Sequence, residues 1–165
     1  MRTDTPIESV EASVYRIPTE DPEADGTLTW DATTLVTVHV TGGGQTGFGY
    51  TYGAAAAARL VRDTLAEQIV GKDAFDVTSA WIGMRRAVRN MGSAGVSATA
   101  ISAVDAALWD LKAKLLDLPL VTLLGAARPR VMAYGSGGFV NLGNKMLHAP
   151  PRWVLGPRLG PAQKE

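Results

Sequence analysis

The chain has 165 residues, of which 46% are hydrophobic, so it is long enough for one ordinary domain with a buried core. Lysine and arginine total 16 and aspartate and glutamate total 16, which gives a net charge of zero. This balance argues against a nucleic-acid partner, because such a protein presents a basic surface to the phosphates. The sequence contains no cysteine, which excludes disulfides and thiolate metal sites.

Targeting and membrane signals are also absent from the sequence pattern. The start, Met1 to Glu11, is polar and has no apolar core of the kind found in a signal peptide. No apolar run approaches the roughly 18 residues that a membrane span requires. We therefore predict a cytoplasmic protein with no membrane partner.

The first part of the chain predicts three β-strands. Apolar and polar residues alternate over residues 7–17 and 33–40, which is the period of a strand with one buried face. The turn Gly42-Gly43-Gly44 leads from the second strand to a third at residues 47–52, and this arrangement is typical of a hairpin. Residues 18–26 contain prolines, acids and a glycine, and are predicted to be a mobile polar loop. The three strands together predict an antiparallel sheet.

The chain then changes to a helical period. Residues 54–70 begin with alanines, which favour a helix, and Gly71 follows as a C-terminal cap. Residues 76–90 and 97–116 predict two more helices, and residues 119–125 a short helical turn. The residues expected on the buried stripe of the second helix are Trp81, Met84 and Val88. Strands followed by helices predict an α+β fold, in which a helical bundle covers the sheet.

The last part of the chain has a different character. Residues 131–134 predict one more short strand, which a glycine-rich run at 135–138 follows. Residues 140–165 contain four prolines and no sustained periodicity. Such a segment predicts an irregular, disordered tail rather than part of a packed core.

Three stretches resemble a known family when they are taken in this order and spacing. They are IESVEASVYRIP at residues 7–18, GFGYTYG at 47–53 and AISAVDAALWDLKAKLLDLPLVTLLG at 100–125. Together they are similar to the amino-terminal capping domain of the mandelate racemase and muconate lactonizing branch of the enolase superfamily. The resemblance covers residues 7–139 and implies an enolase amino-terminal-like domain that caps a modified (β/α) barrel.

The resemblance also implies a parent activity, the magnesium-dependent removal of a proton beside the carboxylate of a small substrate. In that family the barrel supplies three carboxylates for magnesium and a Lys-x-Lys pair or a histidine as the base. The metal and positioned donors make the enediolate intermediate accessible. Dehydration of a sugar acid is the favoured version, and racemisation and cycloisomerisation stay open.

The sequence departs from the family where the barrel should follow. A barrel takes about 200 to 250 residues, and only 35 follow Arg130, with Glu165 as their single acid and no Lys-x-Lys. We therefore expect a capping domain at 1–128, the first strand of a missing barrel at 129–139 and the irregular tail at 140–165. A truncated or frameshifted gene is our hypothesis for this ending.

On this reading the chain has no catalytic residue and no metal ligand of its own, binds no cofactor and is inactive alone. The alternative is a non-catalytic α+β binding or oligomerisation module. Such a module would self-associate through the exposed apolar surface that would otherwise face a barrel.

Substrate-binding residues are expected, by resemblance, at the family's two specificity loops and after the last strand. These residues are Trp30, Tyr50, Thr51, Tyr52 and Ser136. For the two tyrosines, the alternative is ordinary packing against the helices as half-buried strand residues. For Trp30, it is an aromatic that anchors the end of a plain acidic loop.

The remaining charged and histidine residues favour structural roles. Those singled out on the third helix are Asp105, Asp110, Lys112 and Lys114. Such charges usually form solvated pairs or fix a neighbouring element, and Asp105 could brace Arg85 or Arg86. The histidines His39 and His148 are too scattered for a zinc site or a catalytic triad.

Overall fold

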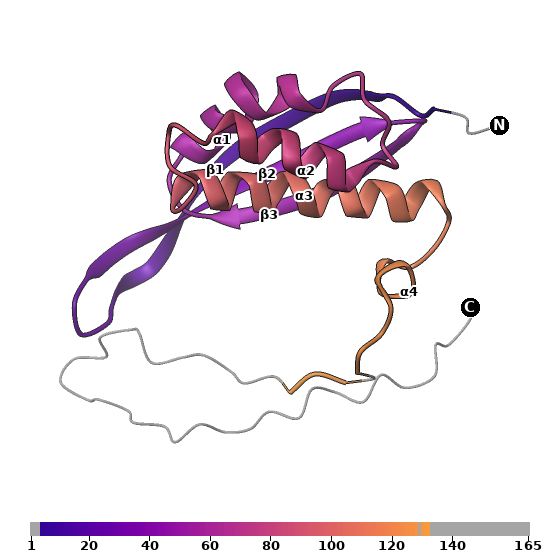
Figure 1. Cartoon of the computed structure of the whole chain (residues 1–165). Helices are drawn as coiled ribbons and strands as arrows, with labels where there is room; N and C mark the ends of the chain where they lie inside the picture. Colours follow the sequence, from indigo (N-terminus) through magenta and orange to yellow (C-terminus); the bar gives the residue numbers. More distant parts are fainter. Residues whose placement is uncertain (1–3, 129, 133–165) are drawn as a thin grey trace. The chain divides into compact units, whose positions relative to one another are not determined.

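The computed structural model describes residues 4–128 and 130–132 (Figure 1). The sheet has the strand order β1-β2-β3, formed by β1 (Ile7–Ala24), β2 (Thr29–Gly42) and β3 (Gln45–Tyr52). β2 and β3 pair antiparallel, with Val38 opposite Gly49. The hydroxyls of Ser9 and Thr41 lie 2.7 Å apart, so the start of β1 lies beside the end of β2 and these strands are antiparallel too. The predicted sheet and glycine hairpin are confirmed.

The prediction of a loop at residues 18–26 is wrong. β1 and β2 both extend into this region and form a second hairpin there. The turn lies between the end of β1 at Ala24 and the start of β2 at Thr29. Asp25 holds it: its Oδ1 accepts hydrogen bonds from the Thr27 amide at 2.7 Å and the Leu28 amide at 2.8 Å. Prolines did not prevent the strand, because β1 is an edge strand with no second neighbour to hydrogen-bond.

Helices follow the sheet in the order expected for an α+β fold. They are α1 (Ala56–Leu60), η1 (Val61–Leu65), η2 (Ala66–Gln68), α2 (Val77–Ala87), α3 (Val96–Leu115) and α4 (Leu120–Leu124). The helix predicted at 54–70 is one helical stretch that passes through α-, π- and 3₁₀-type turns. Gly71 and Gly125 follow helical segments with φ of +78° and +83°, a backbone region that favours glycine.

The core lies between the helices and one face of the sheet (Figure 1). Most of its largest buried side chains come from β2, the first helical stretch with the residue that follows it, and α3. They are Val36, Val38, Val40, Val61, Leu65, Ile69, Val104, Leu108 and Leu111, and Ile7 on β1 and Met84 on α2 add to them. Met84 on α2 and Val88, which caps its C-terminal end, are buried as predicted, but Trp81 is 43% exposed. The small Ala80, one residue earlier, is buried in its place, and Trp81 lies at the surface between α2 and α3.

The helix α3 approaches the backbone of β3 closely because two strand positions are glycine. A Cβ on Gly47 would lie 2.0 Å from the carbonyl oxygen of Ala107, and a Cβ on Gly49 would lie 2.0 Å from that of Ala103. No side chain fits in these places, so the glycines fix how close α3 can come. This contact determines which face of β3 turns toward the helices.

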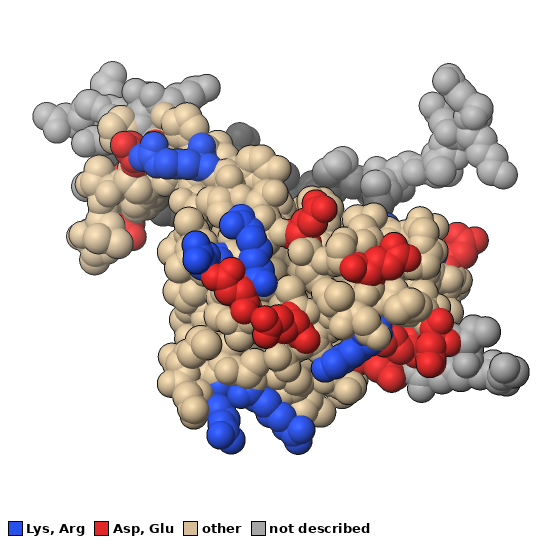
Figure 2. Space-filling model, turned by 90° about the horizontal axis from the view of Figure 1, so that it is seen from above, with Lys and Arg blue, Asp and Glu red and all other residues tan. Residues whose placement is uncertain are grey.

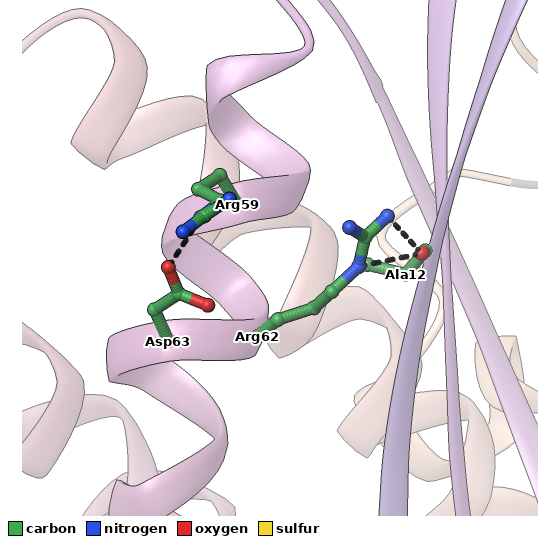
Figure 3. A network of polar contacts seen from close by, with 4 residues as sticks. All are labelled: Ala12, Arg59, Arg62 and Asp63. Atoms are coloured by element: carbon green, nitrogen blue, oxygen red, sulfur yellow. Dashed lines mark hydrogen bonds and ion pairs between the residues drawn. The ribbon is translucent and has the colours of Figure 1, made fainter.

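Side chains from the helices bind backbone groups on the outer edges of the sheet. On β3, the Phe48 amide donates to Oδ2 of Asp110 at 2.8 Å, and the Thr46 carbonyl accepts from Nζ of Lys114 at 2.7 Å. On β1, the carbonyl of Ala12 accepts two hydrogen bonds from Arg62, at 2.8 and 3.1 Å (Figure 3). These bonds satisfy strand groups that have no neighbouring strand.

The surface carries both signs of charge. On the face shown in Figure 2, acidic and basic side chains are interspersed among uncharged areas, and neither sign forms an extended field. Among the described helices, none combines the length and apolar character needed to cross a membrane.

The C-terminal predictions are largely untested. Val131 and Met132 have irregular backbone and exposed side chains, and the rest of the expected strand and the tail at 140–165 lie outside the described residues.

Candidate functional site

The three residues predicted at the end of β3 divide between the two faces of the sheet. Successive strand residues alternate in direction, and Gly47 and Gly49 face α3. Tyr50 and Tyr52 therefore lie on the opposite, helix-free face, where they are 55% and 64% exposed. The alternative that these tyrosines pack on the helices is wrong. The hydroxyl of Thr51 donates to the carbonyl of Tyr52 at 3.2 Å.

Four rings form a continuous line on this free face, which we call the aromatic row: His39, Phe48, Tyr50 and Tyr52. His39 and Phe48 are opposite each other in the register, with ring centroids 5.3 Å apart. Phe48 and Tyr50 follow at 6.1 Å, and Tyr50 and Tyr52 at 6.3 Å in an edge-to-face arrangement. The row offers flat apolar surface with phenol groups toward its end, which suits a ligand with both C–H faces and hydroxyls.

Sequence reasoning found only the end of the aromatic row. It placed His39 in a strand but gave it no neighbour, and it did not single out Phe48. The alternation of Phe48, Tyr50 and Tyr52 carried the signal, since residues two apart in a strand share a face. The pairing with His39 depends on the hairpin register, which the turn sets.

Asp110 and Lys114 position the strand that carries the row. Besides its bond to the Phe48 amide, Asp110 is ion-paired with Lys114 at 2.8 Å. The expectation that these charges fix a neighbouring element is confirmed. They lie one turn apart on α3, where both can reach the outer edge of β3.

Trp30 lies in the second hairpin. Residues 19–32 of this hairpin belong to a different compact unit from residues 1–18 and 33–125, which form the sheet-and-helix body. Its indole Nε1 donates to Oε2 of Glu23 across the hairpin at 2.7 Å. The Leu28 amide, together with the hydroxyl and amide of Thr27, lowers the pKa of Asp25 below its usual value. Trp30 is thus anchored within its own hairpin, and contact with a ligand stays a prediction.

The described residues do not fit a magnesium site. Among them, no three histidine, aspartate or glutamate side chains converge as metal ligands would. Ser136 and His148 lie outside the described residues. A ligand set for the metal of the parent family would have to come from elsewhere.

Asp105 does not brace Arg85 or Arg86: within the described part of the chain, no hydrogen bond or ion pair joins it to either. Arg85 instead donates to the carbonyl of Ser93 at 3.3 Å, and its guanidinium lies 5.5 Å from the ring centre of Trp81.

Comparison with known proteins now identifies the family. Residues 9–125 match the family model described as mandelate racemase / muconate lactonizing enzyme, N-terminal domain. The α+β architecture, an antiparallel sheet covered by helices, matches the fold of that domain. The chain therefore belongs to the mandelate racemase/muconate lactonizing enzyme family, within the enolase superfamily, and contains its N-terminal capping domain.

Individual relatives are similar over the same region. A mandelate racemase/muconate lactonizing enzyme-like protein from Rubrobacter xylanophilus is 50% identical, with a TM-score of 0.78, over 81% of this chain and 37% of its own. The 3,6-anhydro-alpha-L-galactonate cycloisomerase of Streptomyces coelicolor is 38% identical over 79% of this chain and 38% of its own. A mutant L-talarate/galactarate dehydratase liganded with Mg and L-glucarate is 29% identical, with a TM-score of 0.68, over 79% of this chain and 35% of its own. The chain thus spans less than two-fifths of the length of these relatives.

Proposed function

We propose that this chain is the capping part of an enzyme that removes the proton beside the carboxylate of a sugar acid. The match of residues 9–125 to the N-terminal domain of the family carries this proposal. Relatives named as a sugar-acid dehydratase and a cycloisomerase support the substrate class. Dehydration is the favoured outcome, with cycloisomerisation and racemisation as the other candidates.

Within such an enzyme the capping domain would contact the substrate through the end of β3 and the second hairpin. Tyr50 and Tyr52 are exposed, and their phenols can donate to the hydroxyls or carboxylate of a sugar acid. Thr51, bonded to the carbonyl of Tyr52, would hold the backbone of this strand end. By resemblance, Trp30 and Ser136 also stay proposed substrate contacts, each taken by itself.

We further propose that the chain alone has no such activity and is cytoplasmic. The described residues contain no cluster that could hold magnesium, and the family's chemistry needs a base within hydrogen-bond reach of the reacting proton. The cytoplasmic location rests on the cysteine-free sequence.

A chimeric enzyme tests the capping role. Residues 1–128 of this chain would replace the matching part of the Streptomyces coelicolor cycloisomerase, and turnover of a panel of sugar acids would be measured. We expect an active chimera in which Tyr50→Ala and Tyr52→Ala each raise KM about tenfold, the effect of losing one good hydrogen bond to a ligand. Tyr15→Ala is the matched control, because Tyr15 is similarly exposed (51%) but lies on β1.

The full chain alone gives the second measurement. Incubated with magnesium and the same sugar acids in D₂O, it should exchange no α-proton for deuterium by NMR. Exchange by the chain alone would disprove the inactivity. A folded, active chimera whose KM does not respond at Tyr50 or Tyr52 would remove these residues from the contact surface.

A non-catalytic binding or oligomerisation module is the second candidate, and one observation favours it. Four apolar side chains near the end of α3 and in α4 are exposed, and we call them the α4 group: Leu116, Leu118, Val121 and Leu124. Exposed apolar side chains of this kind favour association. In an intact enzyme a second domain could cover them, and in the chain alone a second copy could do so.

A further inference from the structure

A depression of about 210 Å³ lies between α2 and α3, away from the aromatic row. Its lining comes from both helices: Val77, Thr78, Trp81, Asp105 and Trp109. Trp81 lies four residues after Val77 and Trp109 four residues after Asp105, and this spacing brings each pair onto one helix face. The depression therefore has two indole walls and a single carboxylate.

The Asp105 carboxylate lacks a partner in the described part of the chain. It is partly buried, and this burial raises its pKa above the usual value. A carboxylate that loses water without gaining a hydrogen-bond donor is unfavourable. Asp105 thus gives the depression a carboxylate without a hydrogen-bond donor or ion-pair partner among the described residues.

The nearby cations are already engaged elsewhere. Arg85 lies over the ring of Trp81 and donates to the Ser93 carbonyl. Nζ of Lys112 lies 5.2 Å from the ring centre of Trp109 and donates to the carbonyl of Phe75 at 2.9 Å. Both indoles therefore accept cations, but neither cation bonds to the carboxylate between them.

We propose that this depression binds an arginine side chain of a partner protein. A planar guanidinium can lie against the indole rings while two of its N–H groups donate to one carboxylate. A lysine ammonium is a more strongly hydrated point charge and matches the flat walls less well. A neutral apolar group would leave Asp105 without a counter-charge.

The openness of the depression indicates a side chain on a protein rather than a free cation. Trp81 is 43% exposed and Thr78 is also exposed, so water reaches the rim. An isolated small cation would be held weakly there. An arginine carried on a larger complementary surface does not need high affinity by itself, and arginine is enriched among the residues that dominate protein interfaces.

NMR titration of the full chain with capped amino acids tests the proposal. The probes are N-acetyl-arginine amide, its neutral isostere N-acetyl-citrulline amide, and N-acetyl-lysine amide, at matched ionic strength. The indole N–H signals of Trp81 and Trp109, assigned with Trp→Phe variants, report binding. We expect saturable shifts with arginine, about tenfold or more weaker binding of citrulline, and intermediate binding of lysine.

Variants locate the charge that is recognised. Asp105→Asn should abolish the difference between arginine and citrulline, whereas Asp63→Asn, which removes an exposed carboxylate paired with Arg59, should leave it unchanged. Equal binding of citrulline and arginine by the unaltered chain would overturn the proposal without any variant. Binding of lysine as tight as that of arginine, or full arginine discrimination in a folded Asp105→Asn chain, would also overturn it.

Discussion

Gly49 shows how one residue determines the distance between two elements. The oxygen of Ala103 is 2.0 Å from the place where a Cβ on Gly49 would lie, far inside contact distance, and it belongs to the helix backbone. Gly49→Ala must therefore push α3 off the sheet. We expect the free energy of unfolding to fall by about 3 kcal/mol or more, at the upper end of overpacking effects, as measured by urea denaturation followed by circular dichroism.

A second glycine provides the control for that experiment. A Cβ on Gly26 would meet nothing within 4 Å, and its φ lies outside the left-handed region. Gly26→Ala should change the free energy of unfolding by no more than about 0.5 kcal/mol. Similar losses for both variants would mean that the close approach of α3 does not depend on Gly49.

The raised pKa of Asp105 predicts a pH dependence of stability. Since the folded-state pKa lies above the unfolded value, the folded chain binds this proton more tightly than the unfolded chain does. The protonated Asp105 thus contributes to the free energy of unfolding at pH values below its pKa in the unfolded chain. This contribution is lost as the pH rises through its pKa in the folded chain.

Asp105→Asn removes this dependence and leaves no charge to desolvate. The melting temperature of the variant, relative to the unaltered chain, should rise between acidic and neutral pH. Asp63→Asn is the control, because the pair of Asp63 and Arg59 is exposed. A constant difference between the Asp105→Asn variant and the unaltered chain at all pH values would contradict the prediction.

At the scale of elements, the first helical stretch presents two arginines with different roles. Arg62 donates twice to the Ala12 carbonyl on the outer edge of β1, whereas Arg59 pairs with the exposed Asp63 (Figure 3). Arg62→Met keeps most of the apolar stem and loses both hydrogen bonds. It should lower the free energy of unfolding by about 1–2 kcal/mol, because the donor is charged.

Arg59→Met is the matched variant on the same stretch. An exposed pair one turn apart contributes about 0.5 kcal/mol or less, so the two substitutions should differ clearly in chemical denaturation. Equal effects would show that the contact between helix and strand adds nothing beyond a surface ion pair.

The periodicity of the sequence predicted most elements of this fold, because a buried face repeats every two residues in a strand and every three or four in a helix. It failed at residues 18–26, where composition indicated a loop. The side-chain bonds of Asp25 and the contact of Trp30 with Glu23 form that hairpin, and such bonds leave no periodic signal. It also misplaced Trp81, which is exposed while its neighbour Ala80 is buried, since the spacing of apolar residues alone did not separate these two positions.

The candidate site was predictable only in part, for a related reason. The family resemblance placed Tyr50 and Tyr52 at a strand end, and alternation placed them on one face. The pairing of His39 with Phe48 depends on register across the turn, and the position of Asp105 in the depression depends on the packing of α2 against α3. These are relations between distant residues that no local pattern contains.

For the whole molecule, the α4 group predicts association of the chain in isolation. Val121 and Leu124 are 59% and 57% exposed. Their burial against a second copy would favour a dimer, since a fully buried leucine contributes roughly 1.5–3 kcal/mol. Light scattering should show a mass that rises with concentration, and Leu124→Asp should weaken the association roughly tenfold or more.

Thr122→Asp is the control for association, because Thr122 is also exposed on α4 and the substitution adds the same charge without removing an apolar group. A mass equal to one chain at every concentration would exclude the oligomerisation alternative. Equal weakening by both aspartates would attribute the effect to charge rather than to apolar burial.

The bonds at the sheet edges also limit the geometry of any larger assembly. Thr46 and Phe48 on one outer strand, and Ala12 on the other, already have side-chain partners. An incoming strand would have to displace them before it could continue the hydrogen-bond ladder at these positions. Copies of the domain should therefore meet through faces, which allows symmetric, closed oligomers, rather than through repeated strand addition, which leads to open-ended fibres.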